Sequence, residues 1–453
     1  MMRFDQIPSA TPDASNRTAL RLDPYWDGLW QFGSAGQWVK REHAQRLRAA
    51  GVIGQLPGRL RTDPAEALAR IDADWERKLD ILGALAGWRT LTAEQQAAFA
   101  GTVAAGTRDR VIGDLFALGL IDSGTIWAPT SETAGADRAA LWRPATTEVF
   151  DKLLAPLLTY AETVSVTGGE SWTSGSQFDR HNILTAELCL RLAEFARIGT
   201  VLGERLSRVR TLAYSGAGAP EPPGVSNQTA DAVIVRRDGL RIAIETTAHT
   251  GGMHRFVKKV KSWCDVFARR PLETNGLVVC FVGVDRVDVR AEKSVHYAAR
   301  KAIARATRDV PGIASNRTAD RIFYADWTDL FPAPREASAD LFTFRAQRPN
   351  GPSGGWVDAH LLDEESVPFD PSRMPIDPTA VIANASGIRA TPHWLRDPVD
   401  ARPQLHMLSL REAGLDPIPH PARNRRTGIR LQDLESKNRE IGGAIQPPAR
   451  LRF

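Results

Sequence analysis

Apolar residues recur with a helical period in the first third of the chain. Between residues 74 and 85 they fall on one face of a predicted helix: Trp75, Leu79, Leu82 and Leu85. Thr92 is a suitable N-cap for a second helix, and Thr107 for a third that continues to about residue 118. A short strand with a turn is predicted over residues 121–127. The pattern therefore predicts three helices followed by a hairpin.

A different pattern begins near residue 176, where helical stripes alternate with strands. Leu184, Leu188 and Leu192 predict a buried face on a helix that starts near His181. Further elements are predicted at these positions: strands at 231–235, 240–245, 276–282 and 321–325, and helices at 253–268 and 291–307. The strand at 276–282 is apolar throughout, so both of its faces are expected to be covered. Helices on a mixed α/β sheet are the predicted architecture.

These patterns divide the chain into five regions of an α+β multidomain protein. They are a tryptophan-containing arm or cap (1–65), a helical unit (66–145), a helix and linker (146–175), an α/β domain (176–330) and a C-terminal arm (331–453). The last region holds 16 of the 29 prolines and has no sustained periodicity, so an extended, irregular arm is expected. The first region is either an arm that crosses nucleic acid or a cap that packs its tryptophans on the next domain, and we favour the cap.

Residues 66–145 resemble a winged helix-turn-helix domain, because the helices, the turn and the hairpin follow in the same order. In such domains the third helix enters the major groove of DNA. The polar face of that helix carries Thr107, Arg108 and Arg110, which are the candidate DNA contacts. A winged helix that binds another protein is the alternative.

Composition narrows the protein class only slightly. The chain has 453 residues and a net charge of +5, which does not by itself indicate a polyanionic partner. Three cysteines without a CxxC pair argue against a disulfide framework and against a cysteine-based zinc site. No secretory signal and no apolar run long enough to span a membrane are evident. We therefore expect a cytoplasmic protein with no membrane partner.

The sharpest local signal is a predicted hairpin around Asp238-Gly239. A three-residue turn with Gly239 in the left-handed conformation places Asp231 opposite Glu245. One face of the hairpin is then wholly apolar, and both carboxylates lie on the other. A two-residue turn would put the two acids on opposite faces, because one step of register reverses each side chain.

Two facing carboxylates lie about 5 Å apart at Cβ and repel each other unless a cation lies between them. A divalent cation with oxygen ligands would relieve that repulsion. The next predicted helix supplies basic residues, Arg255, Lys258, Lys259 and Lys261, in a chain that has only nine lysines. These four are candidates for phosphate contact, and Lys258 is our choice for the catalytic lysine. A solvated helix face is the equally weighted alternative.

The arrangement of Asp231, the hairpin and Glu245-x-Thr247 resembles the core of the PD-(D/E)xK nucleases. The fold of those nucleases is a restriction-endonuclease-like mixed sheet with helices. That resemblance implies Mg²⁺ or Mn²⁺ on the acid pair and a lysine two residues after the second acid. Here Thr247 stands at the lysine position and Ala230 at the position of the motif's proline. A hydroxyl does not replace an ammonium group electrostatically, so the lysine would have to come from elsewhere.

The order of these motifs resembles the replication-relaxation family of plasmids, phages and integrative elements, which joins a winged helix to a nuclease-like domain. Transferred to this sequence, the resemblance implies Glu204, Asp231 and Glu245 as the acidic, metal-binding set. It also implies His181 as the histidine that opens the helix, although a histidine on that apolar face more often belongs to the core.

The resemblance implies a DNA-binding protein that acts on double-stranded DNA in replication or mobilisation of a mobile element. Other replication or mobilisation proteins are possible further partners. If the core is active, it is a Mg²⁺-dependent endonuclease or nickase. Two alternatives remain open: a non-catalytic DNA-binding regulator with a decayed nuclease core, and an interaction scaffold that does not bind DNA.

Overall fold

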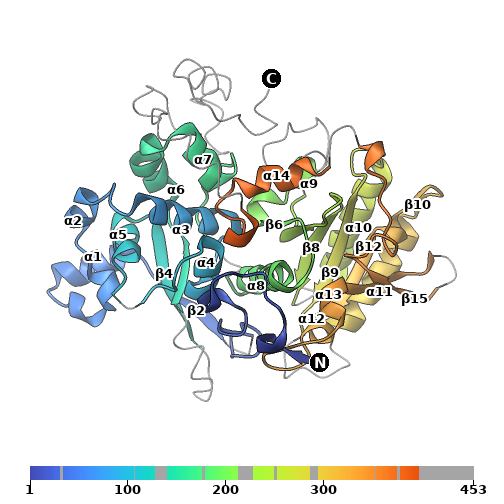
Figure 1. Ribbon diagram of the computed structural model, residues 1–453, viewed down its shortest axis with the longest axis horizontal. Helices are drawn as coiled ribbons and strands as arrows, with labels where there is room; N and C mark the ends of the chain where they lie inside the picture. Colours follow the sequence, from blue (N-terminus) through green and yellow to red (C-terminus); the bar gives the residue numbers. More distant parts are fainter. Residues whose placement is uncertain are drawn as a thin grey trace.

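The described parts of the chain form a mixed α/β structure built on two sheets (Figure 1). The computed structural model describes residues 1–30, 34–106, 108–127, 140–175, 179–212, 228–248, 253–285, 294–351, 354–374 and 378–396. The predicted large mixed sheet with several helices is present. Within these ranges no helix is long and apolar enough to cross a bilayer.

The larger sheet has seven strands in the order β15-β14-β12-β9-β8-β7-β6. Its strands are β6 (Thr200–Gly203), β7 (Ala232–Val235), β8 (Arg241–Thr247), β9 (Leu277–Gly283), β12 (Ile322–Asp326), β14 (Arg345–Pro349) and β15 (Trp356–His360). β6, β7 and β8 form an antiparallel meander, whereas β8, β9 and β12 are parallel. The parallel strands are joined by helices α10 (Met253–Arg269) and α11 (Val295–Asp309). All seven residues of β9 are buried, as its uninterrupted apolar sequence predicts.

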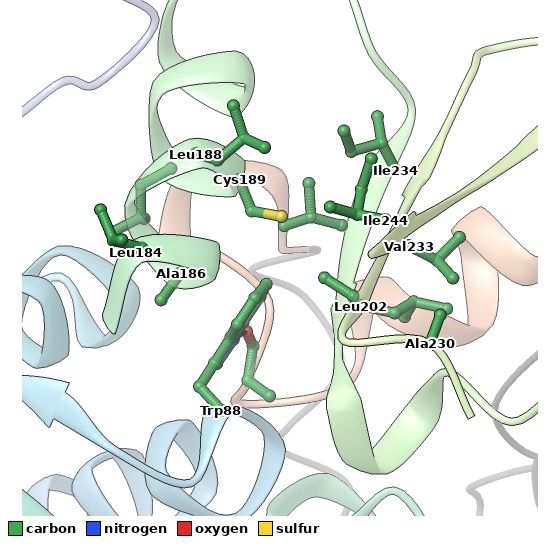
Figure 2. Packing of buried hydrophobic residues seen from close by; sticks show 14 of the residues in the cluster. Trp88, Leu184, Ala186, Leu188, Cys189, Leu202, Ala230, Val233, Ile234 and Ile244 are labelled. Atoms are coloured by element: carbon green, nitrogen blue, oxygen red, sulfur yellow. Dashed lines mark hydrogen bonds between the residues drawn. The ribbon is translucent and has the colours of Figure 1, made fainter. Parts of the chain in front are cut away.

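The predicted hairpin register is confirmed. Ala232 pairs with Ile244 and Ile234 with Ile242, and Gly239 has a φ of +91° in the turn. The apolar face of this hairpin packs on helix α8 (Asp179–Phe195), where Leu188 and Cys189 lie beside Ile234 and Ile244 (Figure 2). The opposite face carries Glu245 and receives Trp263 of α10. The meander is therefore covered on both faces, and Glu245 lies on the α10 side.

The C-terminal region differs from the expected irregular arm. Residues 331–374 contribute α13 (Asp340–Thr343) and strands β14 and β15, which extend the large sheet beyond β12. Helix α14 (Ala380–Ser386) packs near β6. The two strands are short, and intermediate and exposed positions interrupt their buried ones, so they carry no clear period in the sequence. Residues 397–453 lie outside the described part of the chain.

The smaller sheet has four antiparallel strands in the order β2-β4-β5-β3. Its strands are β2 (Ala35–Val39), β3 (Leu91–Thr92), β4 (Ile121–Trp127) and β5 (Ala140–Pro144), with helices α3 (Trp75–Trp88), α4 (Ala93–Ala100) and α5 (Arg110–Leu118). Thr92 caps α4, as predicted. Asp109, not Thr107, caps α5, and Thr107 lies outside the described residues. The order helix, strand, helix, helix, hairpin agrees with the predicted pattern.

Helix α5 is not available to a DNA groove in this structure. Every residue from Val111 to Leu118 is buried, because the segment that contains α1 (Arg41–Ala49) and α2 (Pro64–Ala69) packs along it. A Cβ added at Gly113 would lie 2.4 Å from Thr62 Oγ1. Arg108 and Arg110, two of the three residues expected on the polar face, are exposed, whereas the rest of the helix from Val111 to Leu118 is covered.

The first thirty residues pack on the α/β domain. Arg21 bridges Glu187 and Glu194 of α8 at 3.1 and 3.4 Å, and Phe4 stacks on Phe195. The indole of Trp30 donates to the Val284 carbonyl and is almost fully buried. This arrangement agrees with a cap.

The described part of the expected linker, residues 167–175, is not free. Trp172 is buried there and stacks on Phe150 at 4.2 Å. The remaining helices are α6 (Thr147–Val149), α7 (Tyr160–Thr167), α9 (Val209–Leu212) and α12 (Trp327–Leu330), and the short strand pairs are β1 (Met2–Arg3) with β13 (Glu336–Ala337) and β10 (Gly312–Ile313) with β11 (Asn316–Arg317).

Candidate functional site

An open cavity of about 770 Å³ lies where β7 begins and β8 ends. Its walls come from the first turn of α8, from one flank of α10 and from the segment around β2. Its charged and polar lining includes Asp179, Arg180, His181, Asn182, Glu204, Asp231, Thr246, Thr247, Arg255 and Lys259. Residues that are far apart in the sequence therefore meet at one edge of the large sheet.

Asp231 is held rigidly at the mouth of the hairpin. Its backbone N–H donates to the Ile244 carbonyl at 2.9 Å. Its Oδ2 accepts hydrogen bonds from Thr246 N at 2.8 Å and contacts His181 Nε2 at 2.7 Å. Among the described residues, none hydrogen-bonds the second oxygen, Oδ1, of this cavity-lining carboxylate.

Glu245 lies beneath the cavity and is wholly buried. Its Oε1 accepts a hydrogen bond from Trp263 Nε1 at 2.7 Å, and its Oε2 lies 2.5 Å from Lys259 Nζ. Both partners come from α10. Because Lys259 also lines the cavity, its ammonium group connects the buried acid to the open space.

The two acids have opposite pKa shifts. Burial raises the pKa of Glu245 to about 7, an effect that Lys259 opposes and the neighbouring Asp231 charge reinforces. Burial also acts on Asp231, but attraction to His181 and then to Lys259 outweighs it and lowers the pKa to about 2. Burial lowers the pKa of Lys259, but the two carboxylates more than reverse this, so the pKa is raised and the lysine stays charged. The site thus holds one acid that is firmly ionised and one that titrates near neutral pH.

The lysine beside the acids is Lys259, one position beyond the Lys258 selected from the sequence. Lys258 and Lys261 lie on the other flank of α10, where they line a separate cavity of about 840 Å³ with His254. Lys261 forms an ion pair with Asp309 at 2.6 Å. Only one of the three lysines is therefore directed at the carboxylates.

Thr247, at the position of the motif's lysine, lines the cavity and donates its hydroxyl to the Glu245 carbonyl at 3.3 Å. It does not supply a positive charge. Lys259 supplies that charge from the adjacent helix instead.

His181 and Glu204 both line the cavity. His181 belongs to the site, not to the core as its apolar helical face had suggested, and its contact with Asp231 raises the pKa of the imidazole against the opposing effect of burial. Glu204 is partly exposed and forms an ion pair with Arg89 at 2.7 Å. Two acids of the set of three, Glu204 and Asp231, therefore line the cavity, and Glu245 is buried behind Lys259.

Several residues that line the site escaped the sequence reasoning, two of them beside His181. Arg180 and Asn182 flank His181 at the start of α8, and both line the cavity with Arg255. Arg180 lies over the ring of Trp30 and donates to Ser34 Oγ at 3.3 Å. Their only sequence signal was that they adjoin a candidate histidine at a helix N-terminus.

The donor set is chemically suited to a hard divalent cation, although it is small. Within the described residues no group of three or more His, Cys, Asp or Glu side chains has metal-holding spacing. Mg²⁺, however, is commonly held by one or two carboxylates together with waters and substrate phosphates. Asp231 lines the cavity and Glu245 is buried beside Lys259, so these are the two carboxylates that would hold such an ion.

The DNA-contact candidates of the smaller unit lie elsewhere. Arg108 is exposed, and Arg110 is exposed but forms an ion pair with Asp74 at 2.8 Å. Neither lines the cavity at the large sheet.

Comparison of the chain with protein-family models, with curated proteins and with solved structures gave no match. The resemblance to replication-relaxation proteins therefore rests on the sequence motifs, and the function has to be argued from the site.

Proposed function

We propose that this protein binds double-stranded DNA and cleaves phosphodiester bonds at the Asp231–Glu245 site. The observation that carries the proposal is the 2.5 Å contact of Lys259 Nζ with Glu245 Oε2, beside an Asp231 that His181 and the Thr246 N–H hold. Two carboxylates and an ammonium group are the groups that the nuclease motif requires, and Lys259 compensates for Thr247. As in the sequence-based hypothesis, the protein would serve replication or mobilisation of a mobile element.

Each group of residues at the site would have its own role in phosphodiester cleavage. Mg²⁺ or Mn²⁺ held by Asp231 and Glu245 would activate a water and polarise a phosphoryl oxygen. Lys259 would stabilise negative charge that develops on the phosphate. Arg180 and Arg255 would hold the phosphate backbone at the rim, since guanidinium groups bind phosphate with two parallel hydrogen bonds.

His181 would act through Asp231. Its Nε2 lies 2.7 Å from Oδ2, which leaves Oδ1 as the oxygen for a cation or a water. We therefore assign His181 as a positioning residue. It would fix the direction of the carboxylate and help to keep it ionised.

A nicking assay on supercoiled plasmid tests the proposal, with Mg²⁺, Mn²⁺ or a chelator present. We expect metal-dependent nicking in the unmodified protein and none in Asp231→Asn or Glu245→Gln, which preserve side-chain shape. Asp265→Asn, a partly exposed acid on the far flank of α10, is the matched control and should nick normally.

The three hypotheses predict different results. Unchanged nicking in both acid variants would refute catalysis at this site. Salt-sensitive DNA binding without any nicking would select the non-catalytic regulator. Absence of DNA binding at low salt would select the interaction scaffold.

A further inference from the structure

A further polar cavity, of about 550 Å³, lies at the opposite end of β8 from the Asp231–Glu245 site. It is lined by residues at the beginning of β9 and β12, by the segment 314–317 and by residues 366–370. β8 has seven residues, so the two cavities are separated by about 20 Å along the strand. This further cavity is therefore a distinct site.

Arg321 supplies this cavity with a partly buried positive charge that no carboxylate among the described residues neutralises. Its Nε and Nη2 donate to the Leu277 carbonyl at 3.1 and 2.6 Å, Nη2 also donates to the Thr274 carbonyl, and Nη1 donates to Asn316 Oδ1 at 3.1 Å. None of these acceptors is charged, and no carboxylate among the described residues lies within ion-pair distance. Burial alone lowers the pKa of Arg321 to about 9. A buried charge of this kind usually has a partner of opposite sign.

Two fully buried arginines of this chain do have acidic partners. Arg191 contacts Asp23 and Glu187, at 3.0 and 3.1 Å, and Arg236 contacts Asp238 at 2.6 Å. Four contacts of Arg321 use four of its five N–H groups, which leaves one donor on Nη1. Arg321 is thus prepared for an additional acceptor.

Two further arginines make the cavity more positive. Arg317 and Arg348 share a single carboxylate, Asp320, at 2.7 and 2.6 Å. All three residues line the cavity with Arg321. The rings of Phe323 and Phe369 provide an apolar wall beside this positive charge.

We infer that this cavity binds a small phosphate-bearing ligand, with the phosphate group held between Arg321 and Arg348. Paired guanidinium groups match the geometry of a phosphate dianion. The volume is within the usual range for small-molecule sites, and the aromatic wall suits the base or sugar of a mononucleotide. The same phosphate chemistry is offered by the phosphorylated end of a nucleic-acid strand, which is the second source to be tested.

Isothermal titration of the full chain with inorganic phosphate and with adenosine 5′-monophosphate tests the inference. We expect saturable binding of both probes, and about tenfold weaker binding in Arg348→Ala, which loses one charge-assisted hydrogen bond. Arg321→Met should abolish binding. If Arg321→Met does not fold, Arg348→Ala is the deciding variant. The side chain of Arg348 is partly exposed, and its partner Asp320 retains the ion pair with Arg317 when Arg348 is replaced.

Arg269→Ala is the matched control, because Arg269 is exposed on α10 and does not line this cavity. It should bind both probes as the unmodified protein does. No saturable binding up to about 10 mM probe, or an equal loss in Arg269→Ala, would overturn the inference. A 5′-phosphorylated oligonucleotide that binds more tightly than the mononucleotide, and depends on Arg348, would identify a strand end as the ligand. The result is independent of nicking, since none of these residues lines the Asp231–Glu245 cavity.

Discussion

Helices α5 and α10 are both amphipathic, both begin among basic residues, and both adjoin a hairpin, but their surroundings differ. α5 is buried along its length by the segment that carries α1 and α2, and its Asp114 is neutralised by Arg70 at 2.8 Å. α10 packs one face on the sheet, and its two flanks face two cavities of about 840 and 770 Å³. The order of elements along the chain therefore does not determine which helix is exposed enough to contact DNA. The segments that pack on each helix determine its exposure.

The smaller unit makes hydrogen bonds to the helix turn that lines the site, although its own third helix, α5, is covered. Asp179 at the start of α8 accepts hydrogen bonds from Trp38 Nε1 at 2.8 Å and Thr90 Oγ1 at 2.7 Å. Trp38 belongs to β2, and Thr90 directly precedes β3. These contacts fix the helix turn that carries His181. The smaller unit thus positions the first turn of α8 at the cavity.

The largest expected effect separates the two flanks of α10. Lys259→Met should slow plasmid nicking by about a hundredfold, because the charge beside Glu245 is lost. Lys258→Met, which removes the neighbouring lysine on the opposite flank, should leave the single-turnover rate at saturating DNA almost unchanged. Equal losses in the two variants would mean that Lys259 contributes only general positive charge.

The packing of α5 predicts a change in stability without a change in chemistry. Gly113→Ala would place a Cβ 2.4 Å from Thr62 Oγ1 and 2.8 Å from the Arg59 carbonyl. We expect the free energy of unfolding to fall by about 1–3 kcal/mol in urea titrations, as is usual for overpacking. Gly54→Ala, where an added Cβ meets nothing within 4 Å, is the control. An unchanged midpoint in Gly113→Ala would mean that the α2 segment is not firmly seated on α5.

The raised pKa of Glu245 predicts the pH dependence of nicking. Only the carboxylate form can serve as a metal ligand, so the rate should rise about tenfold per pH unit below about 7 and level off above it. Lys259 holds that pKa down, so Lys259→Met should move the rise to higher pH. A rate that is flat between about pH 6 and 8 in the unmodified protein would exclude Glu245 as the titrating group.

The raised pKa of Glu245 also predicts how the free energy of unfolding depends on pH. The folded-state pKa of Glu245 lies above its ordinary value of 4.5, so the group stabilises the fold below about pH 4.5. That contribution is lost as the pH rises through about 7. Glu245→Gln should therefore flatten the decline in the free energy of unfolding over this window, as measured in denaturant titrations at several pH values.

Much of the larger domain could be predicted because its local signals agree. The Gly239 turn set the register that pairs Ala232 with Ile244, and the apolar β9 required cover on both faces. The choice of Lys258 over Lys259 was an avoidable error. At about 100° per residue, Lys259 borders the stripe of Phe256, Val260, Trp263 and Phe267, whereas Lys258 lies opposite it.

Other features depend on contacts between segments that are far apart in the sequence, so local sequence patterns did not predict them. His181 shares a face with core leucines, yet it sits in the first turn of its helix, where the cavity opens. The burial of α5 depends on residues 41–69, whose helices pack on a surface that the winged-helix pattern alone leaves open. Strands β14 and β15 are stabilised by the edge that β12 offers, since their own apolar pattern is interrupted.

The smallest expected effect concerns the DNA affinity of the α5 turn. Arg108→Ala combined with Arg110→Ala should weaken DNA binding by less than about threefold, because α5 is covered and Arg110 already pairs with Asp74. Arg255→Ala combined with Lys258→Ala removes the same formal charge beside the cavities and should reduce the salt slope of binding by about one to two. Gel-shift titrations at several salt concentrations compare the pairs. A larger loss of DNA affinity in the Arg108–Arg110 double variant would indicate that the smaller unit makes the principal DNA contact. In that case α1 and α2 would have to move away from α5 when DNA binds.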